Sequence, residues 1–461
     1  MARVSVPDWL RQRADLTPQR TALVVGDESW TFTELDQWVN AAASLIHDWS
    51  ARPGDRIGLR AANSASFVVA VHAVARLGAV LVPINTRLTD PDVEWQEAEA
   101  DRKLTLGEGD LASFDGLGQH WRSPDPDREF DLDAWHSIIY TSGTTGRPKG
   151  AILTYGNHWW SAVASALNLG LRSDDVWLAC LPLYHVGGLS ILLRSVICGI
   201  TAVVQSRFDA AEVNRAIDSQ GVSIVSVVST MLDRMLSERG ERPYPPTLRC
   251  VLLGGGPIPL QLLQRAVAIG VPVVQTYGMT ETASQIVTLA PEDATRKVGS
   301  AGKPLMGSQV RIEADGEISV RGPTISPGYL QDVVPRPDGW LHTGDLGYLD
   351  EEGYLYVLDR RDDLIISGGE NVYPAEVEAA LLAHPLVADA GVVGVPDAEW
   401  GRCVAAIVAL KPGASVSADE LIAFCRQRLA GYKVPRLVQF RPSLPRNTAG
   451  KLLRRSLQIE R

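Results

Sequence analysis

The 461-residue chain has little cysteine and no long apolar run. Its five cysteines are an odd number without a C-x-x-C pair, so we expect neither a disulfide framework nor a zinc site; they are Cys180, Cys198, Cys250, Cys403 and Cys425. No apolar stretch approaches the roughly 18 residues of a membrane span, and the N-terminal residues lack the apolar core of a signal peptide. These absences favour a reducing compartment, a cytoplasmic location and no membrane span.

A basic excess is also missing. The net charge is −10 at pH 7 and the pI is near 5.4, whereas binding to a nucleic-acid backbone needs a clear surplus of lysine and arginine. We therefore expect no nucleic-acid partner. The apolar content of 45% and the charged content of 21% are ordinary for a globular protein. An anionic ligand would have to be bound by local positive groups.

Strand and helix patterns alternate along most of the chain, which predicts largely parallel sheets covered by helices. Buried strands are predicted in TALVVG, RIGLRA, TAVVQS, VSIVSVVS, RCVLLGGG and VPVVQTYG. After Gly322 the pattern changes to short strands and turns. The prediction is an α/β protein with an N-terminal domain over 1–359 and a small, mobile α+β domain over 360–461, joined by a hinge at 359–363.

The stretch 140–149 reads YTSGTTGRPK and concentrates groups that bind phosphate. It is not a P-loop. In a P-loop the lysine follows a glycine and precedes a serine or threonine, whereas the lysine here follows a proline and precedes a glycine. Its glycines can still turn backbone N–H groups toward an anion, while its hydroxyl groups and ammonium add donors. A flexible surface loop is the alternative. The candidate residues are Thr141, Ser142, Gly143, Thr144, Thr145, Gly146 and Lys149.

This stretch resembles the phosphate-binding signature of the adenylate-forming superfamily, which includes acyl-CoA synthetases, peptide-synthetase adenylation domains and firefly luciferase. YGMTET is similar to the family's second nucleotide motif. The resemblance implies that Tyr277 lies flat against adenine, that Thr280 lies near the α-phosphate and that Glu281 is the magnesium ligand. LLGGGPIP resembles the loop that lines the adenine pocket, through Gly254, Gly255 and Gly256; a strand-ending turn is the alternative.

Further segments resemble the family's later motifs in the family's order. HTGDLG implies that Asp345 accepts hydrogen bonds from both ribose hydroxyls, with an ordinary turn aspartate as the alternative. DRRDDLIISGGEN implies that Arg360 contacts the nucleotide and that Asp362 is the pivot of the hinge. The same segment implies that Gly368 and Gly369 line the approach of coenzyme A.

LPRNTAGKLLRR resembles the segment of the family that carries the catalytic lysine, here Lys451, although a solvated surface lysine is the alternative. One departure from the family's motifs is Asp359, because the family usually has glycine at this position. This difference puts little of the resemblance in doubt. Another departure is the shortened hairpin between Ile312 and Gly322, which we expect to be a surface loop away from the motifs. The resemblance covers nearly the whole chain.

The resemblance implies a reaction in two steps, with ATP, Mg²⁺ and coenzyme A. A carboxylate attacks the α-phosphate of ATP to give acyl-AMP and pyrophosphate, and a thiol then takes the acyl group. Since two anions approach each other, positive groups are the main catalytic requirement. The chain shows no carrier module, so coenzyme A is favoured as the acceptor.

The segment from TYGNHWW to VICG resembles the 2-succinylbenzoate–CoA ligases of menaquinone synthesis. Those enzymes activate one carboxylate of a dianionic aromatic keto acid, and the other carboxylate needs a cation. Arg194 is the candidate, because it interrupts the apolar run LSILLRSVI; an arginine on the wet side of a helix is the alternative. His185 is another pocket candidate, and the alternative is that it is a histidine satisfied within the core. Ser229 and Ser284 are weaker pocket candidates, with ordinary strand or turn hydroxyls as the alternative.

Two other functions stay open from the sequence. One is a CoA ligase for another aromatic or medium-chain acid, and the other is a catalytically inactive nucleotide-binding sensor. The presence of Glu281, Asp345 and Lys451 argues against the sensor, because a decayed site should have lost one of them. A homodimer is expected by analogy only.

Overall fold

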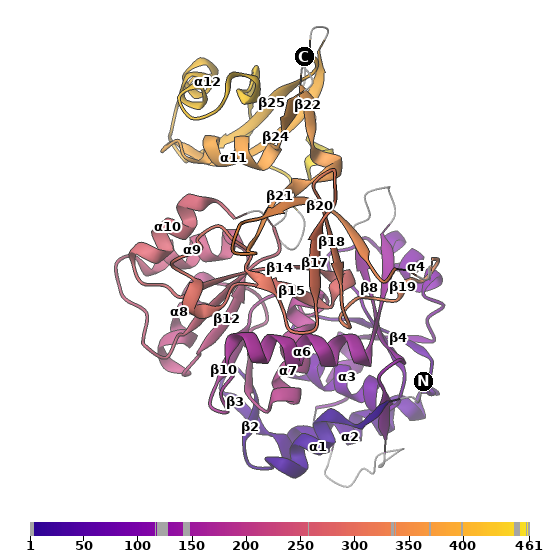
Figure 1. The fold of residues 1–461 in the computed structure, drawn as a ribbon. Coiled ribbons are helices and arrows are strands. Elements are labelled where there is room, and N and C mark those ends of the chain that lie inside the picture. The colour runs from indigo at the N-terminus through magenta and orange to yellow at the C-terminus, as the bar shows by residue number, and fades with distance from the viewer. Residues whose placement is uncertain are drawn as a thin grey trace.

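The structure is a computed structural model that describes residues 4–115, 117, 128–141, 148–256, 258–332, 336, 338–367, 370–397, 400–446, 452–457 and 459. Figure 1 shows a large N-terminal body and a smaller C-terminal unit above it. Sheets and helices alternate in the N-terminal body, so the predicted α/β class with a large N-terminal part and a small C-terminal part is confirmed.

The larger sheet of the N-terminal body has nine strands. In spatial order they are β16 (Lys303–Pro304), β15 (Ser284–Thr288), β14 (Val273–Met279), β13 (Cys250–Leu253), β12 (Ile224–Val227), β10 (Val176–Ala179), β11 (Thr201–Val204), β2 (Thr21–Val25) and β3 (Glu28–Thr31). The six strands from β14 to β2 are parallel to one another. At the edges, β3 pairs antiparallel with β2, β15 pairs antiparallel with β14, and β16 pairs antiparallel with β15. Every residue of β12 and β13 is buried, which explains their continuous apolar sequences.

A second sheet of six strands lies beside the first. Its order is β19 (Gly328–Tyr329), β9 (Lys149–Thr154), β8 (Trp135–Thr141), β5 (Val80–Pro83), β4 (Arg56–Arg60) and β6 (Leu104–Gly107). The four strands from β8 to β6 are parallel to one another. The strand β9 pairs antiparallel with β8, and β19 pairs antiparallel with β9. A short ribbon pairs β1 (Ser5–Pro7) with β7 (Glu129–Asp131).

Helices connect the parallel strands, as a βαβ arrangement requires. They are α1 (Trp9–Leu16), α2 (Phe32–Asp48), α3 (Ala65–Arg76), α4 (Asp90–Glu99), α5 (Glu108–Ala112), α6 (Tyr155–Leu169), α7 (Val186–Cys198), α8 (Ala210–Ser219), α9 (Ser229–Arg239) and α10 (Leu260–Ala268). The helix α6 begins after Thr154, whose hydroxyl accepts from the Asn157 amide, and ends at Gly170 with φ of 58°. These signals fix where α6 begins and ends, and the helix contacts β15 of the larger sheet and β9 of the second sheet.

A four-stranded antiparallel sheet leads to the C-terminal unit. It consists of β17 (Gln309–Ile312), β18 (Glu317–Arg321), β20 (Leu341–Leu349) and β21 (Leu355–Arg360). The C-terminal unit contains β22 (Ile365–Ser367), β23 (Glu370–Val372), α11 (Pro374–Leu382), β24 (Val387–Asp397), β25 (Gly401–Leu410), α12 (Ala418–Arg426) and β26 (Leu437–Phe440). The domain boundary after residue 359 stays a prediction, and the change of sheet after β21 is in keeping with it.

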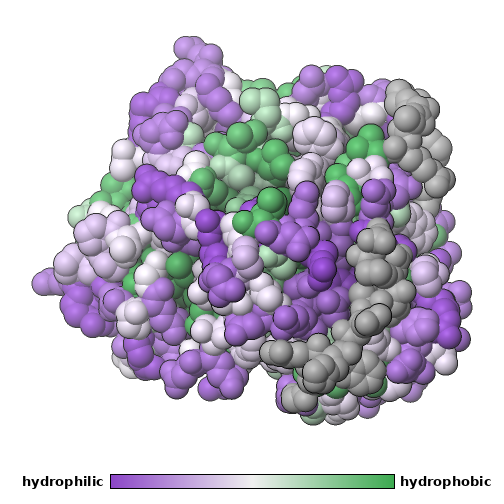
Figure 2. Space-filling model, turned by 90° about the horizontal axis from the view of Figure 1, so that it is seen from below, coloured by the Kyte–Doolittle hydropathy of each residue, from purple (hydrophilic) through white to green (hydrophobic). Residues whose placement is uncertain are grey.

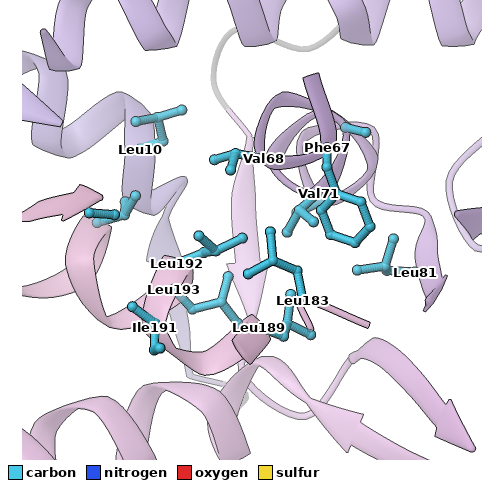
Figure 3. Close-up of a cluster of buried hydrophobic side chains, with 14 of the residues drawn as sticks. Leu10, Phe67, Val68, Val71, Leu81, Leu183, Leu189, Ile191, Leu192 and Leu193 are labelled. Atoms are coloured by element: carbon cyan, nitrogen blue, oxygen red, sulfur yellow. The ribbon is translucent and has the colours of Figure 1, made fainter. Parts of the chain in front are cut away.

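The main apolar core of the N-terminal body includes α3 and α7. Figure 3 shows Val68 and Val71 of α3 in one cluster with Leu189 and Leu192 of α7. The residues from Gly188 to Val196 are all buried. The helix α7 is therefore fixed by packing along most of its length, and any polar side chain on it is held rigidly.

Figure 2 shows the face of the N-terminal body that lies opposite the C-terminal unit, where a hydrophobic patch is surrounded by hydrophilic residues. Apolar side chains with high exposure in this body include Trp160 (43%) and Leu167 (63%), both on α6. None of the helices in the described ranges is long and apolar enough to cross a membrane.

Three histidines are buried where α3, β8 and α6 pack together. The ring of His136 lies 4.6 Å from the ring of His158, and Nε2 of His158 lies 3.1 Å from the Ser137 hydroxyl. Burial lowers the pKa of His72 to about 4 and, together with the nearby Arg194 charge, that of His158 to about 3. Burial also lowers the pKa of His136 well below its ordinary value. All three imidazoles are therefore neutral at pH 7.

These histidines should make the fold less stable in mild acid. Their folded pKa values lie below the unfolded value of about 6.5, so the unfolded chain binds more protons as the pH falls from about 6.5 toward 4. His158→Gln should reduce the pH dependence of the unfolding free energy in this window by up to about 1.4 kcal/mol per pH unit. Urea titrations at pH 5, 6 and 7 measure it. The control is His47→Gln near the end of α2, where the side chain is 41% exposed; equal slopes for the two variants would contradict the prediction.

Candidate active site

The predicted nucleotide and pocket residues follow the carboxyl ends of neighbouring parallel strands. Ser229 follows β12, the glycines 254–256 follow β13 and Thr280 follows β14. His185 comes after β10, at the start of α7. In open α/β sheets ligands bind at this edge. The fold therefore brings residues from distant parts of the sequence to one edge of the large sheet.

The glycine loop passes close to β14. A Cβ on Gly254 would lie 2.7 Å from Thr276 Cγ2 and 2.9 Å from the Thr276 carbonyl oxygen. Gly255 has a φ of 84°, and a Cβ there would lie 3.2 Å from Val228 Cγ1. Side chains are therefore disfavoured at Gly254 and Gly255, and the backbone of Gly254 lies against Thr276, the residue before Tyr277, in agreement with the adenine-pocket hypothesis.

Tyr277, Asp345 and Arg360 form one polar cluster. The Tyr277 hydroxyl donates to Oδ2 of Asp345 over 2.8 Å, and Nε of Arg360 lies 3.2 Å from Oδ1 of Asp345. The cluster forms because β20 and β21 place Asp345 opposite Arg360. Burial, together with the Asp345 charge, raises the pKa of Tyr277 well above its ordinary value. The Tyr277 hydroxyl therefore stays protonated and positions the Asp345 carboxylate, which can accept hydrogen bonds from a diol.

Lys149, Tyr329 and Glu281 form a second cluster. The Tyr329 hydroxyl donates to Oε1 of Glu281 over 2.6 Å, and the Lys149 ammonium lies 5.3 Å from the centre of the Tyr329 ring. Burial and the Glu281 charge raise the pKa of Tyr329. Thr141, the last residue of β8, pairs with Lys149, the first residue of β9, and β9 contacts the short helix Thr280–Thr282 that carries Glu281.

The donor set suits magnesium better than zinc. Within the described ranges no three His, Cys, Asp or Glu side chains form a group that could hold a metal ion. Glu281 offers a single carboxylate, and its side chain is largely buried in the short helix Thr280–Thr282. Magnesium commonly takes one or two protein carboxylates and completes its shell with water and phosphate oxygens. Glu281 therefore fits a magnesium ion that arrives with a nucleotide.

Arg194 is buried in α7 with 2% of its surface exposed, so an arginine on the wet side of the helix is excluded. Its Nη2 donates to the Ser161 hydroxyl over 2.9 Å, and its guanidinium carbon lies 5.7 Å from the centre of the Trp177 ring. Its Nε has no hydrogen-bond partner among the described residues. Burial lowers the pKa of Arg194 to about 10. The group is still cationic at pH 7.

Among the other pocket candidates, Ser284 has a neighbour that is connected to Arg194 by hydrogen bonds. Ser284 follows Ala283, whose carbonyl accepts from the same Ser161 hydroxyl that binds Arg194. His185 precedes α7, nine residues or about 13 Å along the helix from Arg194. Burial lowers the pKa of His185 to about 4, so it offers a neutral imidazole. Ser229 is the first residue of α9.

The hinge segment is tied to the C-terminal unit by Arg454. Its Nη1 donates to Asp363 over 2.8 Å and to Asp359 over 3.1 Å, and its Nη2 donates to Glu378 over 2.7 Å. Asp359 also accepts from the Ala375 amide. Burial raises the pKa of Asp359 and of Glu378, and Arg454 opposes this rise. The departure from glycine at 359 thus supplies a buried carboxylate to this cluster.

The predicted position of the shortened hairpin away from the motifs is wrong. Oε1 of Glu317 accepts from the Gly344 amide, and its Oε2 accepts from Arg361, each over 2.9 Å. Asp315 pairs with Arg361 as well. The contacts arise because β18 pairs with β20, the strand that carries Asp345. The hairpin therefore supports both the ribose motif and the hinge motif.

Asp362 lies exposed in the short helix Arg361–Asp363, directly after β21, where a pivot is expected. Several predicted site residues lie outside the described residues: Ser142, Gly143, Thr144, Thr145, Gly146, Gly368, Gly369 and Lys451.

Sequence reasoning missed four polar residues of the site. Tyr329, Ser161 and Arg454 contact predicted residues, and Gln285 is 2% exposed although neither atom of its amide has a hydrogen-bond partner in the described ranges. The one signal in the sequence was a polar residue inside an apolar segment, as in SQIVT. That pattern does not show which neighbour the side chain meets.

The chain matches two family models. The AMP-binding enzyme model matches residues 10–330, and the model of the AMP-binding enzyme C-terminal domain matches residues 376–451. The chain therefore belongs to the AMP-binding enzyme family.

Close relatives share the full length of the chain. It is 48% identical over 475 aligned residues to the 2-succinylbenzoate–CoA ligase of Bacillus cereus, with 98% of each chain covered. It is also similar to the o-succinylbenzoate CoA synthetase of Bacillus subtilis in complex with the acyl-adenylate intermediate OSB-AMP, with a TM-score of 0.92, 44% identity and 99% of each chain covered. The same synthetase in complex with ATP and a magnesium ion gives a TM-score of 0.90 at 43% identity, covering 98% of this chain and 100% of that chain.

Removal of the Tyr329 hydroxyl should weaken binding of ATP with magnesium. Tyr329→Phe takes away the donor at Oε1 of Glu281, and a hydrogen bond to a charged group corresponds to about a tenfold change in affinity or more. Titration calorimetry should show about a tenfold higher Kd for ATP with Mg²⁺ and a smaller change without Mg²⁺. Tyr348→Phe, on the exposed side of β20, is the control. If both variants bind ATP with Mg²⁺ as the wild type does, Tyr329 does not position Glu281.

Proposed function

We propose that this chain is an AMP-forming 2-succinylbenzoate–CoA ligase of menaquinone biosynthesis. It activates 2-succinylbenzoate with ATP and transfers the acyl group to coenzyme A. The full-length likeness to ligases with that name supports the reaction. The observation that carries the choice of substrate is the buried charge of Arg194, which pairs with no carboxylate in the described ranges.

The buried arginines of the described chain differ in their partners. Arg76 pairs with Asp8 and Asp36, and Arg239 pairs with Asp218. Arg194 has no carboxylate within pairing distance among the described residues, and the nearby Cys198 thiol, whose pKa burial raises to about 11, carries no charge at pH 7. A buried cation without a counter-ion is costly. The second carboxylate of 2-succinylbenzoate would supply that counter-ion.

The two polar clusters suit the parts of ATP. Asp345 accepts from the ribose hydroxyls, Arg360 lies beside it, and Tyr277 packs against the base next to the glycine loop 254–256. Glu281 holds the magnesium ion, which neutralises phosphate charge when bound. Thr280 lies near the α-phosphate. The hydroxyl-rich loop from Thr141 to Gly146 and Lys149 bind the outgoing pyrophosphate.

In the first step an oxygen of the succinyl carboxylate attacks the α-phosphorus. The bond from that phosphorus to the oxygen bridging the α- and β-phosphates breaks, and pyrophosphate leaves. Lys451 lies between the two anions and offsets their repulsion, so no protein nucleophile is required. In the second step the thiol of coenzyme A loses its proton and attacks the acyl carbon, and AMP leaves.

The two steps need different faces of the C-terminal domain. Rotation about Asp362 withdraws Lys451 after the first step, and Gly368 and Gly369 then line the approach of coenzyme A. The residues 1–359 and 360–461 form the two domains of this movement. A cytoplasmic location and a homodimer stay predictions.

A substrate panel tests the proposed function. With 2-succinylbenzoate, ATP, Mg²⁺ and coenzyme A, we expect release of pyrophosphate and formation of 2-succinylbenzoyl-CoA. With benzoate, coumarate or a medium-chain fatty acid, kcat/KM should be at least about 100-fold lower, because a site that holds a buried ionic group rejects a substrate that leaves it unpaired. Equal use of a monocarboxylate would favour the alternative of a ligase for another acid.

Replacement of the lysine separates the two steps. Lys451→Ala should lower the rate of pyrophosphate release by about 100-fold or more, since it removes the positive charge between two anions. Thioester formation from supplied acyl-AMP should stay within about threefold of the wild type. Lys433→Ala is the control, because Lys433 pairs with Glu376 on the surface of the C-terminal unit. Unchanged pyrophosphate release in Lys451→Ala would contradict the proposed role of Lys451 in the first step. Wild-type protein that binds ATP but shows no turnover would favour the alternative of an inactive sensor.

A further inference from the structure

Ser161 is a buried serine on α6, with 1% of its surface exposed. Its hydroxyl lies between two groups from different parts of the chain. It accepts from Nη2 of Arg194 over 2.9 Å and donates to the carbonyl oxygen of Ala283 over 2.7 Å. Ser161 thus connects the buried cation on α7 to the segment that follows Glu281.

The two hydrogen bonds have a fixed polarity. A serine hydroxyl has one proton, and the Ala283 carbonyl can only accept it. The lone pairs of the hydroxyl therefore face Arg194, which can only donate. Since all three groups are buried, loss of either bond would leave an unsatisfied polar group. The guanidinium has one preferred position against Ser161.

The Ala283 side of this contact is a strained turn. Ala283 has a φ of 51° and Ser284 a φ of 88°, both in the left-handed region that side chains other than glycine seldom adopt. On one side, Gly278 passes so close that a Cβ there would lie 1.6 Å from the Ser284 carbonyl oxygen. On the other side, the Ser161 hydroxyl holds Ala283. The turn between Glu281 and β15 is thus held from two directions.

Polar groups without partners in the described ranges lie on α7 and β15, two of the elements that meet at this contact. The helices α6 and α7 pack against each other and against β15. On α7, Nε of Arg194 lacks a hydrogen-bond partner within the described ranges, and on β15 both amide atoms of Gln285 do as well. Buried polar groups are normally satisfied by protein, water or ligand. This junction has hydrogen-bonding capacity that the described residues leave unused.

We propose that Ser161 is a positioning residue for substrate selection. It sets the distance between Arg194, which binds the non-reacting carboxylate, and the turn after Glu281, beside which the reacting carboxylate meets the nucleotide. An acid with two carboxylates at the right separation reaches both Arg194 and the turn after Glu281. An acid with one carboxylate places that carboxylate at the turn and leaves Arg194 without a bound anion. This inference rests on the proposed function.

The decisive variant is Ser161→Ala. The KM for 2-succinylbenzoate should rise about tenfold or more, because the guanidinium loses its acceptor, while the KM for ATP should change less than about threefold. With 4-oxo-4-phenylbutanoate, which lacks the ring carboxylate, the variant and the wild type should have KM values within about threefold of each other. The double variant Ser161→Ala/Arg194→Ala should be no worse with the diacid than Arg194→Ala alone, because Ser161 acts through Arg194.

The control is Ser165→Ala, one turn further along α6. Ser165 is fully buried, and its hydroxyl has no hydrogen-bond partner among the described residues, so this variant removes the same atom without breaking a contact. Thermal unfolding of both variants shows whether the fold is intact. Equal effects of Ser161→Ala on both acids, or the same KM values for Ser161→Ala and Ser165→Ala, would overturn the inference while leaving the proposed function in place. Wild-type enzyme without activity on 2-succinylbenzoate would overturn both.

Discussion

Between β14 and β15 the backbone of Gly278 passes so close to the Ser284 carbonyl that no side chain fits between them. This approach closes the reversal of the chain that carries Thr280 and Glu281. On one side of the reversal, β14 presents Tyr277 to Asp345, and on the other side β15 packs against α6 and α7. The nucleotide cluster and the acyl pocket therefore share one rigid backbone segment, and a displacement of this turn would disturb both.

The buried arginines of the described chain differ in whether a carboxylate pairs with them. Arg76 and Arg239 are buried with carboxylates and stabilise the fold as satisfied groups. Arg194 is buried with a hydroxyl, a ring face and no described carboxylate, an arrangement that favours an anionic ligand. In a chain with net charge −10, binding of the proposed dianionic substrate depends on such local cations.

The C-terminal unit is joined to the N-terminal body by more than the chain itself. Arg454 contacts Asp359 at the end of β21 and Glu378 on α11, so it spans the segment in which the proposed pivot Asp362 lies. The hairpin at Glu317 holds Arg361 from the opposite side. Any rotation about Asp362 must therefore exchange buried charge pairs, which favours two discrete orientations over a continuum. Glu317, which takes part in these contacts, lies outside the recognised motifs.

The sequence alone determined the α/β class, the family and its chemistry, because alternating apolar segments and short motifs are local properties of the chain. It also singled out Arg194, since a charge inside an apolar run is visible without coordinates. Whether that charge faced water or the interior could be decided only by the packing of α7 against α3 and α6 (Figure 3). Gln285 was visible only as a polar residue inside an apolar segment. Ser161, Tyr329 and Arg454 carried no local signal of their roles, because their hydrogen-bond partners lie between 33 and 122 residues away in the chain. The same holds for the hairpin 313–321, whose contact with the hinge depends on the pairing of β18 with β20. Long-range pairing of this kind depends on the whole fold, which is why only the tertiary structure could show it.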